Sequence, residues 1–423
     1  MKAITKLLVA GALAGAIVAT VSLTAGAEQS DSAATSGETA GKDYAQLVSD
    51  NSVRILEKTE AKVFESADGT ALNYRAYYSP AYDAEDKANP AMVFVFLHGS
   101  GGKGDDNEKQ ITDQPATVNY LASDAAEEFF AGIPYIVIAP QCPEGAQWVD
   151  TPYAAGSYSI DAVAETPYSK AVFELIQSII ANENGDASNV ILGGISMGGY
   201  GTWDLALRHP ETFNAIYPIC GGGDHSKASV LKDNGVKVWA FHCDGDQSVP
   251  VAGSREMIAA LEEIGADAVY TEFEIAGHNA WTPALKQVKD PYLIEWMFDE
   301  CRKCTVNITV GEGGSVQKTT ETVRIGETVR LEISTEEGYL AEGLTVNGEA
   351  VEYITDDSGN LSYECVAEGN MEVVASFAPI PAEETPEEPK GLPTAAKVGI
   401  IAAAVAAVVG GAAAFLISKK KKK

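Results

Sequence analysis

The stretch NVILGGISMGGY, residues 189–200, decides the fold. Val190–Gly193 is a short apolar run typical of a buried strand, and Met197–Arg208 has the composition of a helix. Between them lies the motif G-x-S-x-G, centred on Ser196. At a sharp strand-to-helix turn, glycines avoid steric clashes and the serine hydroxyl is exposed at the helix N-terminus. The pattern predicts a nucleophile elbow carried by Ser196; the alternative is a glycine-rich turn with a capping serine.

Outward from the elbow, apolar β-branched runs alternate with amphipathic stretches. Strands alternating with helices favour a mostly parallel sheet that is covered on both faces, an α/β fold. The expected strands are Ala91–Leu97, Tyr135–Ala139, Val190–Gly193, Ala215–Ile219, Val236–Phe241 and Val269–Ile275, and the expected helices are Tyr168–Ala181, Met197–Arg208, Ser254–Ile264 and Pro291–Glu300.

A serine hydroxyl is a poor nucleophile unless a base takes its proton. In a fold with this elbow, the chain order is serine, then acid, then histidine. Of the five histidines, only His278 follows the last expected strand, in the segment AGHNAW, residues 276–281. We therefore expect His278 to be the general base; the alternative is an ordinary surface-loop histidine.

The acid of the triad is expected in the loop after Val236–Phe241, which reads HCDGDQSVP. Both Asp244 and Asp246 lie in this loop, and an acid there orients the imidazole and stabilises its charged form. The spacing alone leaves the choice between them open. The carboxylate that does not face the imidazole is expected to brace the loop.

A glycine-rich loop, His98–Gly102, directly follows the expected strand Ala91–Leu97. A loop in this position can direct a backbone N–H at a developing oxyanion. We expect the N–H groups of Ser100 and Met197 to form that oxyanion hole. A phosphate-binding role is disfavoured because the P-loop pattern and the dinucleotide-binding glycine spacing are both missing.

Lys42–Lys303 resembles extracellular esterases with the α/β-hydrolase fold that are grouped with predicted peptidases, feruloyl esterases and acetyl-xylan esterases. The resemblance implies Ser196, Asp246 and His278 as the triad, and Trp148 and Trp281 as aromatic residues that line the cleft; the alternative for the two tryptophans is plain packing in the core or at the rim. The sequence departs from the group at Cys243, where glycine is usual. The matching stretches are FLHGSGGKGDDN, IAPQCPEGAQWVD, GGISMGGYGTWDLALRHPETFNAIYPICGGGD, FHCDGDQSVP and AGHNAW.

After Cys304 the sequence takes on the alternating pattern of β-strands. Val306, Ile308 and Val310 alternate with polar residues, and Asn347-Gly348 is a strong signal for a two-residue hairpin. The segment is similar to the divergent bacterial surface repeat related to internalin B-repeats, in VGEGGSV, GETVRLEI, EEGYLAEGLTVNG and MEVVASF. We expect a small all-β module without a catalytic constellation.

The two ends of the chain predict export and anchoring. Met1–Ala27 has two lysines, an apolar run and a small-residue cleavage site, as a secretory signal peptide has. Val398–Ile417 is an apolar run long enough to span a bilayer, and Lys419–Lys423 favours the cytoplasmic side. The segment Leu392–Ala396 resembles the wall-sorting signal of Gram-positive bacteria, and we expect a protein of such a bacterium. Because the segment lacks the Leu-Pro-x-Thr-Gly pattern, we expect a membrane anchor and not attachment to the cell wall.

The predicted organisation therefore has seven parts. They are a signal peptide (1–27), a linker (28–41), a catalytic α/β-hydrolase domain (42–303), an all-β module (304–379), a spacer rich in Pro and Glu (380–397), a transmembrane helix (398–417) and a cytoplasmic lysine tail (418–423).

The formal net charge of the 423-residue chain is -30, which disfavours nucleic acid as a partner because phosphate backbones would be repelled. Cys301-x-x-Cys304 lacks a second pair of ligands for zinc, and we expect the six cysteines to be buried thiols or to form one structural bridge.

Hydrolysis of carboxylic esters through an acyl-enzyme, on polysaccharide acetyl or feruloyl groups, is the leading hypothesis, and this chemistry needs no metal or organic cofactor. The alternatives are a serine peptidase of the prolyl-oligopeptidase-like type, and a surface binding protein whose hydrolase domain is inactive.

Overall fold

The computed structural model describes residues 54–112, 117–286 and 293–380, which fall into two compact units. The larger unit holds the described residues up to Thr305 with Thr322–Glu327 and Val366–Asn370, and the smaller unit holds the remainder. The predicted signal peptide, linker, transmembrane helix and lysine tail lie outside the described residues, as does the spacer after Ile380. In the described ranges, no helix combines the length and apolar character needed to cross a membrane.

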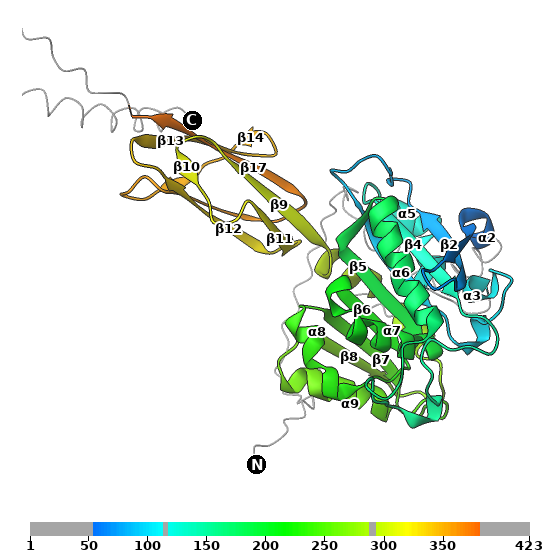
Figure 1. Cartoon of the computed structure of the whole chain (residues 1–423). Helices are drawn as coiled ribbons and strands as arrows, with labels where there is room; N and C mark the ends of the chain where they lie inside the picture. Colours follow the sequence, from blue (N-terminus) through cyan, green and yellow to red (C-terminus); the bar gives the residue numbers. More distant parts are fainter. Residues whose placement is uncertain (1–53, 113–116, 287–292, 381–423) are drawn as a thin grey trace, which may run out of the picture. The chain divides into compact units, whose positions relative to one another are not determined.

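The larger unit is built on an eight-stranded mixed sheet with the order β1-β2-β4-β3-β5-β6-β7-β8. Figure 1 labels β2, β4, β5, β6, β7 and β8 of this sheet. Its first two pairings, β1 with β2 and β2 with β4, are antiparallel, and every later pairing is parallel. The strands are β1 (Glu60–Glu65), β2 (Ala71–Tyr78), β3 (Ala91–Leu97), β4 (Tyr135–Gln141), β5 (Gly185–Ile195), β6 (Ala215–Ile219), β7 (Lys237–Cys243) and β8 (Ala268–Phe273).

The predicted parallel strands are all present, and β3 and β6 have the predicted bounds. The antiparallel edge made by β1 and β2 was not predicted, because β1 is largely exposed and its sequence, EAKVFE, has few apolar residues. The mixed sheet is consistent with the α/β-hydrolase expectation.

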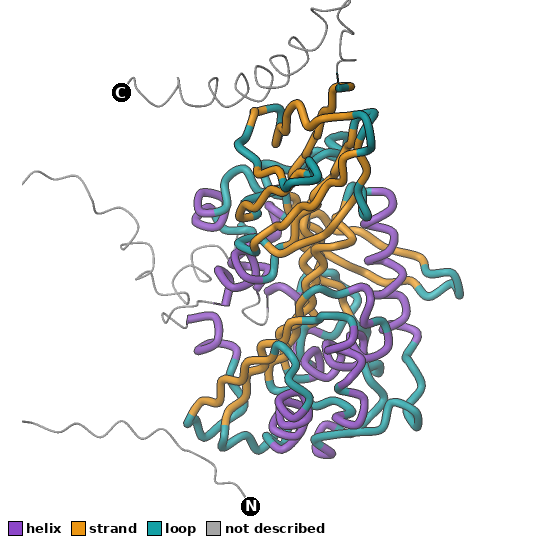
Figure 2. The backbone as a smooth tube through the Cα atoms, turned by 90° about the vertical axis from the view of Figure 1, so that its left-hand side faces the viewer, coloured by secondary structure: helices purple, strands orange, loops and turns teal. Residues whose placement is uncertain are grey.

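Helices cover both faces of this sheet, as the tube in Figure 2 shows for the strand layer of the larger unit. Side chains alternate along each strand, so Val93 and Val95 of β3 enter one core while Phe94 and Phe96 enter the other. The first core is closed by α6 (Pro167–Asn182), α7 (Met197–Arg208), α8 (Ser229–Asp233) and α9 (Ala252–Glu263), and the second by α4 (Thr117–Leu121), α5 (Asp124–Phe129), α10 (Trp281–Lys286) and α11 (Leu293–Glu295).

Short helical segments make up the rest of the unit. The last predicted helix, Pro291–Glu300, is not a regular α-helix over its described part, because Trp296–Glu300 forms a π-helical turn after α11. The other segments are α2 (Ile55–Lys58), α3 (Lys109–Thr112) and the 3₁₀ turns η2 (Ser100–Gly102), η3 (Tyr153–Ala155), η4 (Pro210–Thr212) and η5 (His225–Lys227); the π-helical turn is η6.

The smaller unit is built on two sheets, with the orders β10-β12-β16-β15 and β11-β9-β17-β13-β14. The first residues of β9 and the last residues of β11 and β16 are counted with the larger unit. Alternate residues of β12, namely Val329, Leu331 and Ile333, are buried, as the pattern predicts for a sheet with one covered face. The strands are β9 (Lys303–Val310), β10 (Gly314–Ser315), β11 (Thr320–Arg324), β12 (Thr328–Thr335), β13 (Tyr339–Val346), β14 (Glu349–Ala350), β15 (Ile354–Thr355), β16 (Leu361–Val366) and β17 (Met371–Pro379).

The predicted hairpin is present in this unit. Asn347 and Gly348 connect β13 to β14, and both have positive φ, 50° and 81°. A two-residue turn with both central residues in this region has the twist that matches the flanking antiparallel strands.

Candidate active site

Ser196 lies at the sharp turn between β5 and α7, in a strained backbone conformation with φ 55° and ψ −114°. Two backbone hydrogen bonds hold the turn: Ser196 N donates to Ile219 O at 2.8 Å, and Tyr200 N donates to Ser196 O at 3.1 Å. A non-glycine residue with positive φ costs of order 1–3 kcal/mol and persists only where the surrounding structure imposes it. The neighbouring strand β6 and the first turn of α7 impose it here.

Glycine is required on both sides of the serine. A Cβ on Gly198 would lie 1.9 Å from Leu97 O, and a Cβ on Gly194 would lie 2.4 Å from Gly198 O, both far inside van der Waals contact. The elbow therefore packs backbone against backbone at the carboxyl end of β3. This packing brings the glycine-rich loop after β3 next to the nucleophile.

The structure brings Ser196, His278 and Asp246 together in a linear relay, although they are far apart in the sequence. His278 Nε2 lies 2.7 Å from Ser196 Oγ, and His278 Nδ1 lies 2.6 Å from Asp246 Oδ2. Because the carboxylate only accepts, Nδ1 carries the proton and Nε2 accepts from the serine hydroxyl. This is the tautomer that a general base for Ser196 needs.

Asp246 is held as a carboxylate in a fully buried position, with 0% of its side chain exposed. Its Oδ1 accepts from Ser248 N at 2.8 Å and from Val249 N at 3.0 Å. Burial acts to raise the pKa of Asp246, but the hydrogen bonds from His278, Val249 and Ser248 outweigh it, so the pKa is lowered. The group is therefore ionised at neutral pH and positioned to stabilise an imidazolium on His278.

The structure separates the two candidate acids. Asp244 is exposed and its Oδ1 accepts from Ile275 N at 3.1 Å, so it braces the loop that carries His278. Asp246, two residues further on, is the carboxylate that faces the imidazole.

The two expected oxyanion donors flank the elbow. Met197 is the first residue of α7 and Ser100 the first residue of η2, positions whose N–H groups have no partner within their own helix. The Gly198 contact with Leu97 O places the two segments against each other. The arrangement suits a carbonyl oxygen that becomes negatively charged when Ser196 attacks.

The two tryptophans differ in position. Trp281 is partly buried and packs edge-on against His278, with ring centroids 5.4 Å apart, so it lies beside the general base. Trp148 corrects the expectation that it lines the cleft: it is 0% exposed, and its Nε1 donates to His98 O at 3.1 Å. Trp148 is therefore a core residue, and its indole supports the start of the glycine-rich loop, His98–Gly102.

His98 also supports this loop. Its Nδ1 donates to Gly99 O at 2.6 Å and its Nε2 accepts from Cys142 N at 2.9 Å. Burial lowers the pKa of His98 to about 4, against the opposing effect of the Gly99 hydrogen bond. The imidazole is therefore neutral near pH 7, and its two hydrogen bonds connect the loop at Gly99 to the backbone at Cys142.

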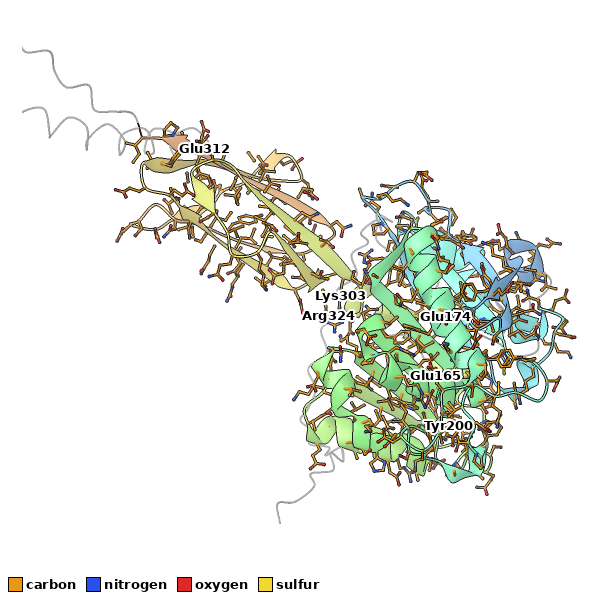
Figure 3. All side chains as sticks on the ribbon, viewed as in Figure 1. Glu165, Glu174, Tyr200, Lys303, Glu312 and Arg324 are labelled. Carbon is orange, nitrogen blue, oxygen red and sulfur yellow. The ribbon has the colours of Figure 1, made fainter. Side chains whose placement is uncertain are left out.

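Tyr200, labelled in Figure 3, lies one turn after the nucleophile on α7. It is 1% exposed, and its hydroxyl donates to Tyr153 O at 2.7 Å. Tyr200 thereby fixes the loop between β4 and α6 against the first turn of α7.

His242 is a residue of the site that the sequence pattern did not single out, and it is buried against the triad acid. Its Nε2 lies 3.2 Å from Asp246 Oδ2. The spacing His242-x-x-x-Asp246 at the end of a strand is the signal that could have identified it.

One group of side chains within the described ranges has the spacing of metal ligands. Ligand atoms of Cys220, His242 and Asp246 lie within 4.8 Å of one another. Asp246 Oδ2 is already engaged by His278, and Cys220 Sγ donates to His278 O at 3.2 Å. A cation bound there would displace the contact of Asp246 with His278, so the cluster belongs to the site built around Ser196, His278 and Asp246. The six cysteines are all free thiols, and burial raises the pKa of Cys220 well above its usual range.

A scan of protein-family models and a search of curated proteins find no match to this chain. Solved structures do match. A thermostable esterase is 30% identical over 58% of this chain and 64% of its own, with a TM-score of 0.50, so the chain spans just under two thirds of that esterase.

More distant matches are the fluorophosphonate-binding serine hydrolase F of Staphylococcus aureus and a feruloyl esterase module from Clostridium thermocellum. The first is 15% identical over 56% of this chain and 97% of its own, with a TM-score of 0.39. The second is 14% identical over 54% of this chain and 86% of its own, with a TM-score of 0.38. The match to the thermostable esterase, together with the mixed sheet, gives the larger unit an α/β-hydrolase-like fold.

Proposed function

We propose that this chain is a serine carboxylic-ester hydrolase that works through an acyl-enzyme. The observation that carries the proposal is the relay from Ser196 Oγ through His278 to Asp246, with both hydrogen bonds at or below 2.7 Å. The 30% identity to a thermostable esterase supports an ester as the substrate.

The proposed reaction follows from this geometry. His278 Nε2 takes the Ser196 proton as Oγ attacks the ester carbonyl, and Asp246 stabilises the imidazolium that forms. The N–H groups of Ser100 and Met197 stabilise the oxyanion. His278 then protonates the leaving alcohol, and water, activated by the same imidazole, hydrolyses the acyl-Ser196 ester.

We further propose that the enzyme is exported and anchored outside the cell by residues 398–417, and that it acts on acetyl or feruloyl esters of polysaccharides. The signal-peptide pattern of Met1–Ala27 and the lysines after Ile417 support export and anchoring. The resemblance of Lys42–Lys303 to extracellular polysaccharide esterases supports the substrate class, and the resemblance of 304–379 to a surface repeat supports a surface location.

An activity-based fluorophosphonate probe tests the chemistry directly. The wild-type chain is expected to be labelled on Ser196, and S196A is expected to be unlabelled. A panel of acetylated xylan, feruloyl esters and peptide amides then separates the proposed esterase from a peptidase. If the wild-type chain is not labelled, and if the wild type and S196A bind polysaccharide equally well, the protein would instead be a surface binding protein.

A further inference from the structure

We propose that His242 is a positioning residue for the triad: its Nε2–H donates to Asp246 and holds the carboxylate in the orientation that His278 needs. The proposal rests on the proposed hydrolase function and adds a residue to its site. His242 is the sixth residue of β7, four positions before Asp246, and its side chain and that of Asp246 are both 0% exposed.

The surroundings of the imidazole determine where its hydrogen lies. Nε2 lies 3.2 Å from Asp246 Oδ2 and 3.2 Å from Val249 O, two groups that only accept hydrogen bonds. An unprotonated Nε2 would place its lone pair against both oxygens in a buried site, at the cost of an unsatisfied polar contact. Nε2 therefore carries a hydrogen, whichever state Nδ1 adopts.

The other side of the ring is fixed to the scaffold. Nδ1 lies 2.8 Å from the hydroxyl of Ser254, a fully buried residue of α9. The same hydroxyl lies within hydrogen-bond distance of Gly221 O, at 2.9 Å. The imidazole thus connects α9 and the loop after β6 to the acid, so its orientation is set by elements outside the loop that carries Asp246.

With this donor, the carboxylate of Asp246 has four hydrogen-bond partners. Oδ1 accepts from the N–H groups of Ser248 and Val249, and Oδ2 accepts from His278. The fourth donor is the Nε2–H of His242, which Asp246 Oδ2 shares with Val249 O. A carboxylate offers about four lone-pair positions, so all of them are used. Without the His242 donor, His278 is the remaining side-chain donor to Asp246 Oδ2. Asp246 would then be oriented by the same imidazole that it has to position.

A pair of substitutions separates hydrogen bonding from packing. H242Q keeps an N–H donor near the position of Nε2. H242L places an apolar side chain in the same space and has no N–H donor. We expect H242L to lower kcat/KM and the rate of fluorophosphonate labelling roughly 10- to 100-fold, the scale of one hydrogen bond to a charged group, mainly through kcat. H242Q should recover most of that loss, to within about threefold of wild type.

Two further variants complete the set. S254A removes the anchor on Nδ1 and should lower kcat less than H242L does. H209Q is the matched control, because His209 follows the far end of α7, where it stacks on Phe173 and contacts Glu165. H209Q should label at the wild-type rate. If H242L and H242Q label equally fast, or if both match wild type, His242 only fills the core and the proposal fails.

A spectroscopic measurement on the wild-type protein tests the proposal without relying on activity. In ¹⁵N-histidine-labelled wild-type protein at neutral pH, His242 Nε2 should appear as a protonated nitrogen, identified by its loss in H242Q. An unprotonated Nε2 would overturn the proposal. A wild-type chain that neither labels nor hydrolyses esters would refute the proposed function, whereas the state of Nε2 would still decide the role of His242.

Discussion

His278 Nδ1 lies 2.6 Å from Asp246 Oδ2, and this contact joins the loops that follow β8 and β7. The two loops are adjacent because β7 and β8 pair in parallel and end at the same edge of the sheet. Ser196 reaches the same edge from β5, two strands away from β7. The sheet thus assembles the site from three strand ends, as open α/β sheets do with residues at their carboxyl edge.

Substitution of Ser196 by alanine is expected to abolish turnover while the fold is retained. Loss of the nucleophile should lower kcat/KM for a feruloyl or acetyl ester by roughly 10⁴- to 10⁶-fold. The matched control is S188A, on the same strand β5 near its opposite end, where the hydroxyl donates to Asp186. S188A should hydrolyse the ester at the wild-type rate; a comparable loss in both variants would remove Ser196 from its assigned role.

The two aspartates of the loop after β7 are expected to differ sharply. D246N removes the acceptor for His278 Nδ1–H and favours the wrong tautomer, so kcat should fall by roughly 10⁴-fold. D244N should change kcat less than about tenfold, because Asp244 contacts the loop backbone at Ile275 N and not the imidazole. Steady-state kinetics on both variants decides the assignment, and the reverse order would show that Asp244 is the acid.

Alanine at Gly198 is expected to prevent the elbow from forming. Its Cβ would lie 1.9 Å from Leu97 O, and the backbone has to move to relieve the clash. We expect G198A to lose about 3 kcal/mol or more of unfolding free energy and to lose fluorophosphonate labelling. G277A is the control, since apart from Gly277 and its two chain neighbours no described residue has an atom within 4 Å of the position that its methyl group would take. Urea unfolding should leave G277A within about 1 kcal/mol of wild type.

His98 is expected to contribute to acid sensitivity. Its folded-state pKa is about 4, below the ordinary value of 6.5, because it is buried. Between these two pH values the unfolded chain binds a proton at His98 and the folded chain does not, so the unfolding free energy falls as the pH falls from about 6.5 towards 4.

The variant H98Q isolates this effect. It should be less stable than wild type near pH 7, because the hydrogen bonds to Gly99 O and from Cys142 N are disturbed. Its deficit should narrow as the pH falls from about 6.5 towards 4. Urea unfolding across this range measures it, and a deficit that is constant with pH would show that His98 does not carry the proton linkage.

The sequence by itself determined the local parts of this protein. The apolar run that ends at Ile195, the glycines around Ser196 and the helix over Met197–Arg208 are encoded by residues next to one another, so strand, elbow and helix were predictable. The order of the expected strands placed His278 after the last strand of the sheet, where the structure has it. The hairpin at Asn347-Gly348 was equally local, because backbone preference alone selects that turn.

Only the tertiary structure decided which groups face one another. Asp244 and Asp246 have the same chemistry and nearly the same position, and the choice depends on how the loop after β7 bonds to Ile275 and His278. The burial of Trp148 and the contact of His242 with Asp246 arise in the same way, from packing between strands and helices distant in the chain. Periodicity reports which face of an element is apolar, whereas the direction of a polar side chain depends on the partners that folding brings within hydrogen-bond distance.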